Sequence, residues 1–451
     1  MTNYSNSTTQ MWLDFEALSP ETIDLSPESI AQAVELSTNI PNQQQQWQTY
    51  LNVLALYAFE EWLGSRSIDL TIDREHCPVL QPAIANAIDA VCNLKVNEFN
   101  ICLMAAGSLI DEEVTLPRAV VDIPEFVPHF YVLVEVQEEQ ETALIHSFLS
   151  YEELVNRRTT VNLAADEDWT YQLPLTWFNS DPDRLLLYLR CLEPTTISLP
   201  VSQSNRTMQL ARIRSELEAL LPQLQSPERQ LWQVLTWEQG IVVLTSPELL
   251  NWVYQLQRGE ITSTSTQTSL QQHLSDILQL LTQPAVNVGR WLWNELDELA
   301  QELSWVLLPS LAPAGPIRTP VEEFEAIVKQ LAQTGVDIPA QARGAYRDLQ
   351  LAGMPLRLYA VTWPMLSESI PEWTLLLVLG ATPGTSLPPG LQLRVSDQTG
   401  ILVEQALDTQ AGNSYFFTSV VGTRDEKFIV TVGLTPAIEQ TLPPFSFNSE
   451  R

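Results

Sequence analysis

The sequence has 451 residues, of which 55 are Asp or Glu and 23 are Lys or Arg, so its formal net charge at neutral pH is −32. Residues 1–195 hold 30 of the acidic and 8 of the basic residues. A negative field of this size repels phosphate backbones and attracts basic proteins, which disfavours nucleic-acid binding. A hydrophobic content of 45% excludes a disordered chain, and the length predicts two or three domains.

The sequence also predicts a compartment. The first residues carry no basic segment followed by an apolar one, so no signal peptide is expected. The longest apolar stretches, such as Trp373–Leu379, are far shorter than the roughly 20 residues that span a bilayer. The cysteines are too few for a disulfide scaffold and are interpreted as reduced thiols. We therefore expect a soluble, cytoplasmic protein without a membrane partner.

Residues 1–195 are predicted to form an acidic α+β domain with a helix in front of a small antiparallel sheet or barrel. The clearest helix is Gln46–Ser65, and from Ser67 to Glu193 the pattern changes to alternating strands. Leu185–Leu192 fits either a buried strand or a helix. The apolar stripe of the first helix, expected to face the core, consists of Trp47, Leu51, Leu54, Ala58 and Trp62.

Residues 196–318 are predicted to be a helical middle region. The domain boundary before it is placed at Pro194–Thr207, which is rich in Pro, Ser and Thr. Helical spacing recurs along this region. The expected helices are Met208–Leu224, Pro227–Trp237, Pro247–Arg258, Leu270–Leu281 and Gly289–Leu307.

Residues 319–451 are predicted to be a helical lead-in, Val321–Gln333 and Ala340–Leu351, followed by an immunoglobulin-like β-sandwich. Ser396–Gly400 and Gly422–Glu426 are expected to be hairpin turns. The short strands that support the sandwich are Leu356–Trp363, Trp373–Ala381, Leu391–Val395, Ile401–Leu407, Tyr415–Val421 and Phe428–Leu434.

The familiar catalytic motifs are missing from the sequence. It has no phosphate-binding loop, dinucleotide fingerprint, nucleophile elbow, His-Glu-x-x-His or EF-hand loop. His76-Cys77, with Cys92 and Cys102 downstream, lacks the paired spacing of a zinc site and is interpreted as core. We expect no cofactor and no metal, and assign no catalytic residue.

Acidic clusters in the first domain are the candidate functional feature. Each cluster alone is typical of a solvated loop, but their concentration in one domain favours an acidic face that docks a basic protein. Two carboxylates could instead act as acid and base in glycoside hydrolysis, although nothing in the sequence singles out a pair. The candidate partner-binding residues are Asp111, Glu112, Glu113, Glu138, Glu139, Glu141, Asp166, Glu167 and Asp168.

Several segments together resemble a cyanobacterial domain-of-unknown-function family, number 1822, over nearly the whole chain. The resemblance implies a cyanobacterial, cytoplasmic origin and transfers no activity and no functional residue. The segments that carry it are Trp47–Asn52 running to Trp62-Leu63, Val286–Leu292, Arg357-Leu358-Tyr359, and Glu426-Lys427-Phe428 through Leu442–Phe445.

We therefore expect a non-enzymatic regulatory or interaction protein whose acidic first domain docks a basic partner, with a sigma-factor-like regulator as the concrete candidate. The middle helices would serve as a spacer or an oligomer surface, and the sandwich would provide a second contact. The alternative is a hydrolase of an unrecognised class that uses Asp or Glu of the first domain. A purely structural module is a third possibility.

Overall fold

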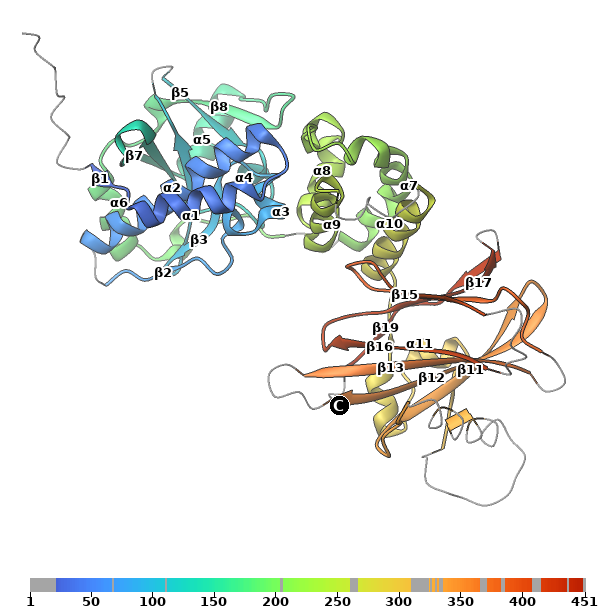
Figure 1. The fold of residues 1–451 in the computed structure, drawn as a ribbon. Helices are drawn as coiled ribbons and strands as arrows, with labels where there is room; N and C mark the ends of the chain where they lie inside the picture. The colour runs from blue at the N-terminus through green and yellow to red at the C-terminus, as the bar shows by residue number, and fades with distance from the viewer. Residues whose placement is uncertain are drawn as a thin grey trace, which may run out of the picture. The chain divides into compact units, whose positions relative to one another are not determined.

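The computed structural model forms two compact units. Unit 1 is Met1–Gln203 with Ser226–Thr245, and unit 2 is Ser204–Gln225 with Ser246–Arg451. Both contain helices and sheets, so the chain is an α+β protein (Figure 1). The boundaries drawn from the sequence after residues 195 and 318 stay a prediction. The structure describes residues 22–66, 69–109, 112–202, 206–259, 267–309, 324, 327–328, 331, 336–365, 371–382, 386–407, 415–435 and 438–448.

Unit 1 is built on a six-stranded sheet with the order β1-β7-β6-β4-β3-β2. Its neighbouring strands are antiparallel except for β4 and β6, which run parallel, so the prediction of an antiparallel sheet is wrong at this pair. The connection between β4 and β6 contains β5 and α4, and it is long enough to return the chain in the same direction. The strands are β1 Ile23–Asp24, β2 Ile72–Asp73, β3 Val91–Val96, β4 Phe99–Ala106, β6 Phe130–Gln137 and β7 Thr142–Ser150.

Helix α2 (Gln43–Arg66) packs on this sheet and buries most of the predicted apolar stripe, as the 0% exposure of Leu54 illustrates. Trp47 is the exception, because 52% of its surface is exposed, so its assignment to the core is wrong. The amide of the next residue, Gln48, already donates to the Ala105 carbonyl near the end of β4 (3.2 Å). Trp47 therefore lies where the sheet no longer supplies side chains to cover it.

The other elements of unit 1 follow local signals. Ser26 caps α1, and Ser150 forms a capping box with Glu153 at the start of α5. Residues Leu185–Leu192, whose pattern fitted either a strand or a helix, belong to helix α6 except for the last residue. The remaining elements are α1 Pro27–Thr38, η1 Pro78–Leu80, α3 Pro82–Ala85, β5 Glu113–Pro117, α4 Ala119–Asp122, η2 Glu138–Gln140, α5 Tyr151–Val161, β8 Thr170–Pro174, η3 Leu175–Trp177, α6 Pro182–Cys191 and η4 Pro194–Thr196.

Residues 226–245 return to unit 1 as η5 (Leu231–Gln233) and α8 (Trp237–Leu244). The predicted helix Pro227–Trp237 is wrong, since Thr236 is the N-cap at which α8 begins. The buried Asn42 amide donates to the carbonyls of Pro227 and Glu228 (both 3.3 Å) and ties this segment to the start of α2.

Three of the helices predicted for the middle region are present in unit 2. They are α7 (Arg206–Leu224), α9 (Pro247–Gln257) and α10 (Gln267–Thr282). The predicted helix Gly289–Leu307 is wrong. Asn294 adopts a left-handed conformation (φ 57°) that ends the first turns, and Asp297 caps a new short helix. The segment consists of η6 Val288–Trp293, α11 Glu298–Glu302 and β10 Val306–Leu307.

Two sheets of unit 2 share one hydrophobic core. Their orders are β10-β11-β12-β13-β16 and β15-β14-β17-β18, and a short parallel pair, β9 with β19, lies beside them. All six predicted strands are present. The strands are β9 Val286–Asn287, β11 Arg343–Leu351, β12 Met354–Met365, β13 Glu372–Ala381, β14 Gln392–Ser396, β15 Ile401–Ala406, β16 Tyr415–Thr423, β17 Ile429–Thr435, β18 Ile438–Thr441 and β19 Phe445–Ser446.

Two further predictions for unit 2 are corrected. Ala340–Leu351 is not helical, because Arg343–Leu351 pairs along its whole length with β12 and buries Leu349 and Leu351 in the core. The turn Gly422–Glu426 is not a hairpin, since it leads from β16 in one sheet to β17 in the other. In Val321–Gln333 the described residues are helical, and the rest lie outside the described residues.

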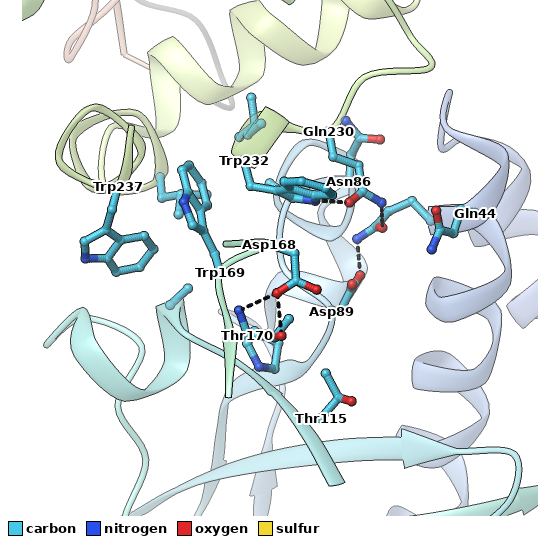
Figure 2. A pocket seen from close by; sticks show the side chains of 16 residues that line it. Gln44, Asn86, Asp89, Thr115, Asp168, Trp169, Thr170, Gln230, Trp232 and Trp237 are labelled. Carbon is cyan, nitrogen blue, oxygen red and sulfur yellow. Dashed lines mark hydrogen bonds between the residues drawn. The ribbon is translucent and has the colours of Figure 1, made fainter. Parts of the chain in front are cut away.

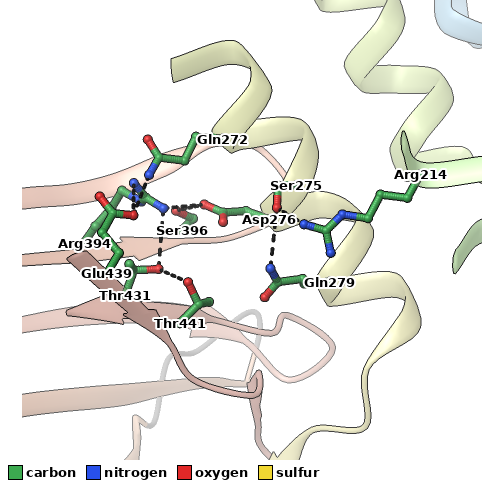
Figure 3. A network of polar contacts seen from close by, with 10 residues as sticks. All are labelled: Arg214, Gln272, Ser275, Asp276, Gln279, Arg394, Ser396, Thr431, Glu439 and Thr441. Atoms are coloured by element: carbon green, nitrogen blue, oxygen red, sulfur yellow. Dashed lines mark hydrogen bonds and ion pairs between the residues drawn. The ribbon is translucent and has the colours of Figure 1, made fainter. Parts of the chain in front are cut away.

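A buried polar network joins α10 to the four-stranded sheet (Figure 3). Asp276 on α10 accepts a hydrogen bond from Ser396 (2.9 Å) and lies 3.6 Å from the guanidinium of Arg394. Arg394 also faces Glu439 (3.9 Å), which accepts from the Gln272 amide (2.8 Å). Asp276 and Arg394 are only 2% and 5% exposed, so this network is part of the packing of unit 2.

Candidate functional site

The acidic candidate residues are spread over three places in unit 1. Glu112 and Glu113 lie at the start of β5, while Asp166, Glu167 and Asp168 precede β8. Since Glu113 pairs with Pro174 and Pro117 with Thr170, these two clusters lie at opposite ends of the β5–β8 ribbon. All eight described candidates are exposed, and Asp111 lies outside the described residues. The third cluster, on the turn between β6 and β7, is Glu138, Glu139 and Glu141.

The third cluster borders a groove of about 290 Å³, which we call the Trp47 groove. It lies at the carboxyl ends of the parallel strands β4 and β6, beside the first turns of α2. The Trp47 ring contacts Tyr50 (centroids 5.5 Å apart), and burial together with the nearby Glu138 and Glu141 raises the pKa of Tyr50. The groove is lined by Trp47, Leu51, Gly107, Val136, Gln137, Glu138, Glu139 and Gln140.

A second hollow of unit 1, the Asp89 cavity, has a volume of about 240 Å³ (Figure 2). It is enclosed by the start of α2, the loop before β3, the β5–β8 ribbon and residues 230–244. Asp168 is the only one of the candidate acidic residues that lines it. Its lining consists of Gln44, Gln45, Asn86, Ala87, Asp89, Thr115, Pro117, Ala119, Asp168, Trp169, Thr170, Gln230, Leu231, Trp232, Trp237 and Leu244.

A chain of hydrogen bonds ends on Asp89 in this cavity. The Trp232 indole N–H donates to Gln230 Oε1, the Gln230 amide donates to Gln45 Oε1 (3.2 Å), and the Gln45 amide donates to Asp89 Oδ1. An indole can only donate and a carboxylate can only accept, so the two ends fix the direction of both amides. Asn42 Oδ1 accepts from the Gln45 backbone N–H (3.1 Å) and positions the central amide.

Asp89 is accessible to solvent from the cavity, yet surrounding protein displaces much of the bulk water around it. This desolvation outweighs the hydrogen bond from Gln45 and raises the pKa of the Asp89 carboxyl to about 6. Asp168 is fixed from its own loop, since its Oδ1 accepts from the Thr170 backbone N–H (3.2 Å) and from the Thr170 hydroxyl (2.6 Å). Figure 2 shows both carboxyls facing the same space below the indoles of Trp169 and Trp232.

The aromatic wall of the cavity is fixed by tight packing. Trp169 has φ 61°, a conformation that bulky residues rarely adopt, and its ring rests on Gly240, where any Cβ would collide with it. Its edge meets Trp237 (centroids 5.2 Å apart), and Arg118 covers the other ring at 4.3 Å from the Trp237 centroid. The indoles are therefore held in place before any ligand binds.

Arg118 is in turn paired with Asp122 (2.8 Å), which also binds Arg158 (2.6 Å) and the Tyr171 hydroxyl (2.9 Å). Burial alone would raise the pKa of Asp122, but the bonds from the two arginines outweigh it and hold this pKa below its usual value. Arg118 and Arg158 thus neutralise Asp122, and Asp89 and Asp168 have no cationic partner among the described residues.

Sequence reasoning missed Asp89, Gln45 and Gln230, because an isolated Asp and two isolated Gln carry no motif. A helix-capping signal acts over three residues, whereas Gln45 and Gln230 are 185 positions apart. The only available clue was the high number of Trp residues, 13 in the chain.

Comparison with known proteins identifies the family. Within the described part of the chain, no helix is both long and apolar enough to cross a membrane. Neither the curated proteins nor the solved structures include a match to this sequence. Residues 23–442 match the family described as protein of unknown function (DUF1822), and this match spans both units, so the chain belongs to that family.

Proposed function

We propose that unit 1 docks a basic protein partner in the Trp47 groove, as a regulatory or interaction module without catalysis. The observation that carries this proposal is a half-exposed indole beside Glu138 and Glu139 in a groove. Trp is among the residues most often found at binding hot spots, and its face attracts Lys and Arg. Carboxylates at the rim would add charge complementarity and speed association.

The charge balance of unit 1 supports a basic partner. At least five of its nine described Lys and Arg side chains form ion pairs with carboxylates of the same unit. None of the eight described candidate carboxylates is in an ion pair with a described Lys or Arg. The negative field around the groove is therefore left for a partner to neutralise.

The charge of unit 1 sets only the class of the partner, a basic protein. Among basic regulatory proteins, a sigma-factor-like protein is one candidate. We place the complex in the cytoplasm of a cyanobacterium, an origin that the sequence resemblance implies. The four cysteines are free, in keeping with a reducing compartment.

The test is affinity purification of the tagged full chain from its native cells at low salt, with mass spectrometry. We expect one stoichiometric basic protein that is lost with Trp47→Ala and with the double variant Glu138→Gln/Glu139→Gln. The matched control, Glu28→Gln/Glu35→Gln, removes the same charge from exposed positions of α1 and should retain it.

The purified pair should then associate more slowly as salt is raised. If both double variants retain the partner equally, the contact lies outside the Trp47 groove. A complex that is indifferent to salt would contradict the electrostatic mechanism.

A hydrolase of unrecognised class is the second candidate, and one observation favours it. Asp89 can hold a proton up to about pH 6 while it shares a cavity with Asp168, an arrangement suited to general acid catalysis. A screen of chromogenic glycosides and esters tests it, with Asp89→Asn and Asp168→Asn as inactive references. Turnover that survives both substitutions would exclude this cavity as the active site.

We also propose that the two-sheet part of unit 2 is an immunoglobulin-like sandwich. Its four-stranded sheet, β15-β14-β17-β18, has the order C′-C-F-G of such folds, and β12-β13-β16 has the order A-B-E. An experimental structure whose sheets were connected in another order would overturn this assignment.

A further inference from the structure

The Asp89 cavity has a chemical character that selects its ligand. None of the side chains that line it is Lys, Arg or His, and two of them, Asp89 and Asp168, are carboxylates. An anionic ligand would meet only repulsion there. The volume of about 240 Å³ holds roughly eight water-sized groups of about 30 Å³ each, so the ligand is small.

The hydrogen bonds that orient both carboxylates come from neutral donors. Asp89 accepts from the Gln45 amide, and Asp168 accepts from the Thr170 backbone and hydroxyl. These donors fix the positions of the oxygens but leave two negative charges without a cationic partner among the described residues. A neutral ligand would leave both charges as they are, whereas a cation would neutralise them.

Three indole rings line the Asp89 cavity beside the carboxylates. Trp169, Trp232 and Trp237 line the same cavity, and Trp169 is locked against Gly240. Indole faces attract organic cations more strongly than the other aromatic rings do, and they also cover aliphatic carbons. Carboxylates with indoles form a site for an ammonium group on a short hydrocarbon chain.

We propose that the Asp89 cavity binds a small organic ammonium ion of the aliphatic amine or diamine class. The ammonium contacts the Asp89 and Asp168 carboxylates, and the hydrocarbon part lies against the Trp169 and Trp232 indoles. The relay from Trp232 through Gln230 and Gln45 keeps Asp89 oriented as an acceptor. This inference concerns binding in a cavity separate from the Trp47 groove, so it is independent of the docking proposal.

Calorimetric titration of the full chain with putrescine tests the inference. We expect saturable binding at one site, and no binding of the neutral diol with the same four-carbon chain. Asp89→Asn and Asp168→Asn should each weaken putrescine binding about tenfold or more, because each removes one charged acceptor of the ammonium. The matched control Glu167→Gln removes the same charge next to Asp168 but outside the cavity lining and should change the affinity less than about twofold.

A pH series gives a second readout. Asp89 and Asp168 are the titratable side chains of the lining, and Asp89 loses its proton near pH 6 while the amine stays protonated. Putrescine affinity should therefore increase severalfold between about pH 5 and about pH 7, and Asp89→Asn should reduce this increase.

Three results would overturn the proposal. The first is absence of saturable putrescine binding to the wild-type chain. The second is binding of the diol or of glucose as tight as that of putrescine, which would assign the cavity to neutral hydroxyl ligands. The third is a loss of putrescine affinity with Glu167→Gln that equals the loss with Asp89→Asn and Asp168→Asn. Such a result would show only a general attraction of the amine to an acidic protein. The comparison of putrescine with the diol uses the wild-type chain, so it decides even if a variant fails to fold.

Discussion

Asp89 in unit 1 and Asp276 in unit 2 both have a pKa raised by desolvation, but Asp89 is exposed to its cavity and Asp276 is buried, and their partners differ. Asp276 has Arg394 and Ser396 as partners and is 2% exposed (Figure 3). Asp89 has a neutral amide as its partner and faces a cavity. A carboxylate paired with a cation inside the packing is therefore structural, whereas one oriented by neutral donors toward a cavity is available for a ligand.

The largest loss of stability is expected when the network of Asp276, Arg394 and Glu439 is broken. Arg394→Met leaves the buried Asp276 and the half-buried Glu439 without their cation, so the free energy of unfolding should fall by about 3–5 kcal/mol. Urea denaturation of the full chain measures this change. Arg190→Met is the matched control, because it removes an ion pair between the exposed side chains of Arg190 and Asp69 and should cost about 1 kcal/mol or less. Equal losses in the two variants would contradict a special role for burial.

His273, which neighbours the network on α10, should make stability depend on pH. It is 5% exposed, its Nδ1 accepts from the Trp252 indole (3.1 Å), and burial, partly offset by Asp397, lowers its pKa to about 4. The unfolded chain binds this proton near pH 6.5, so stability is full above that pH and declines as the pH falls toward 4. The loss amounts to at most about 3 kcal/mol.

The measurement is the free energy of unfolding between about pH 4 and about pH 7 for the wild type and for His273→Gln, which can still accept from Trp252. The variant should have a shallower slope in this window. Identical slopes would show that His273 is not the titrating group.

Asp89 should affect the pH dependence of stability in the opposite direction to His273, and more weakly. Its folded-state pKa of about 6 lies above the usual value near 3.9, so the folded chain holds a proton that the unfolded chain has lost, and stability falls as the pH rises through this window. At neutral pH, Asp89→Asn should therefore stabilise the chain by about 1 kcal/mol, a figure reduced because solvent reaches the carboxyl. Thermal unfolding at neutral pH measures it, and a destabilised variant would mean that Asp89 is a structural carboxylate like Asp276.

Features that depend on neighbouring residues follow from the amino-acid sequence alone. The caps at Ser26 and Ser150 are local, because each side chain accepts from a backbone N–H three residues away. The alternation in Leu391–Val395 revealed a strand, because successive side chains of a strand face opposite sides. The acidity of residues 1–195 is also a property of composition alone.

Contacts between side chains that are distant in the sequence depend on the tertiary structure. Trp47 follows helical spacing but is exposed, because the sheet ends beneath it. Arg343–Leu351 contains good helix formers, yet pairing with β12 makes it a strand. The Asp89 cavity gathers residues from positions 44 to 244, and their approach depends on a core and on long-range hydrogen bonds that no local pattern encodes.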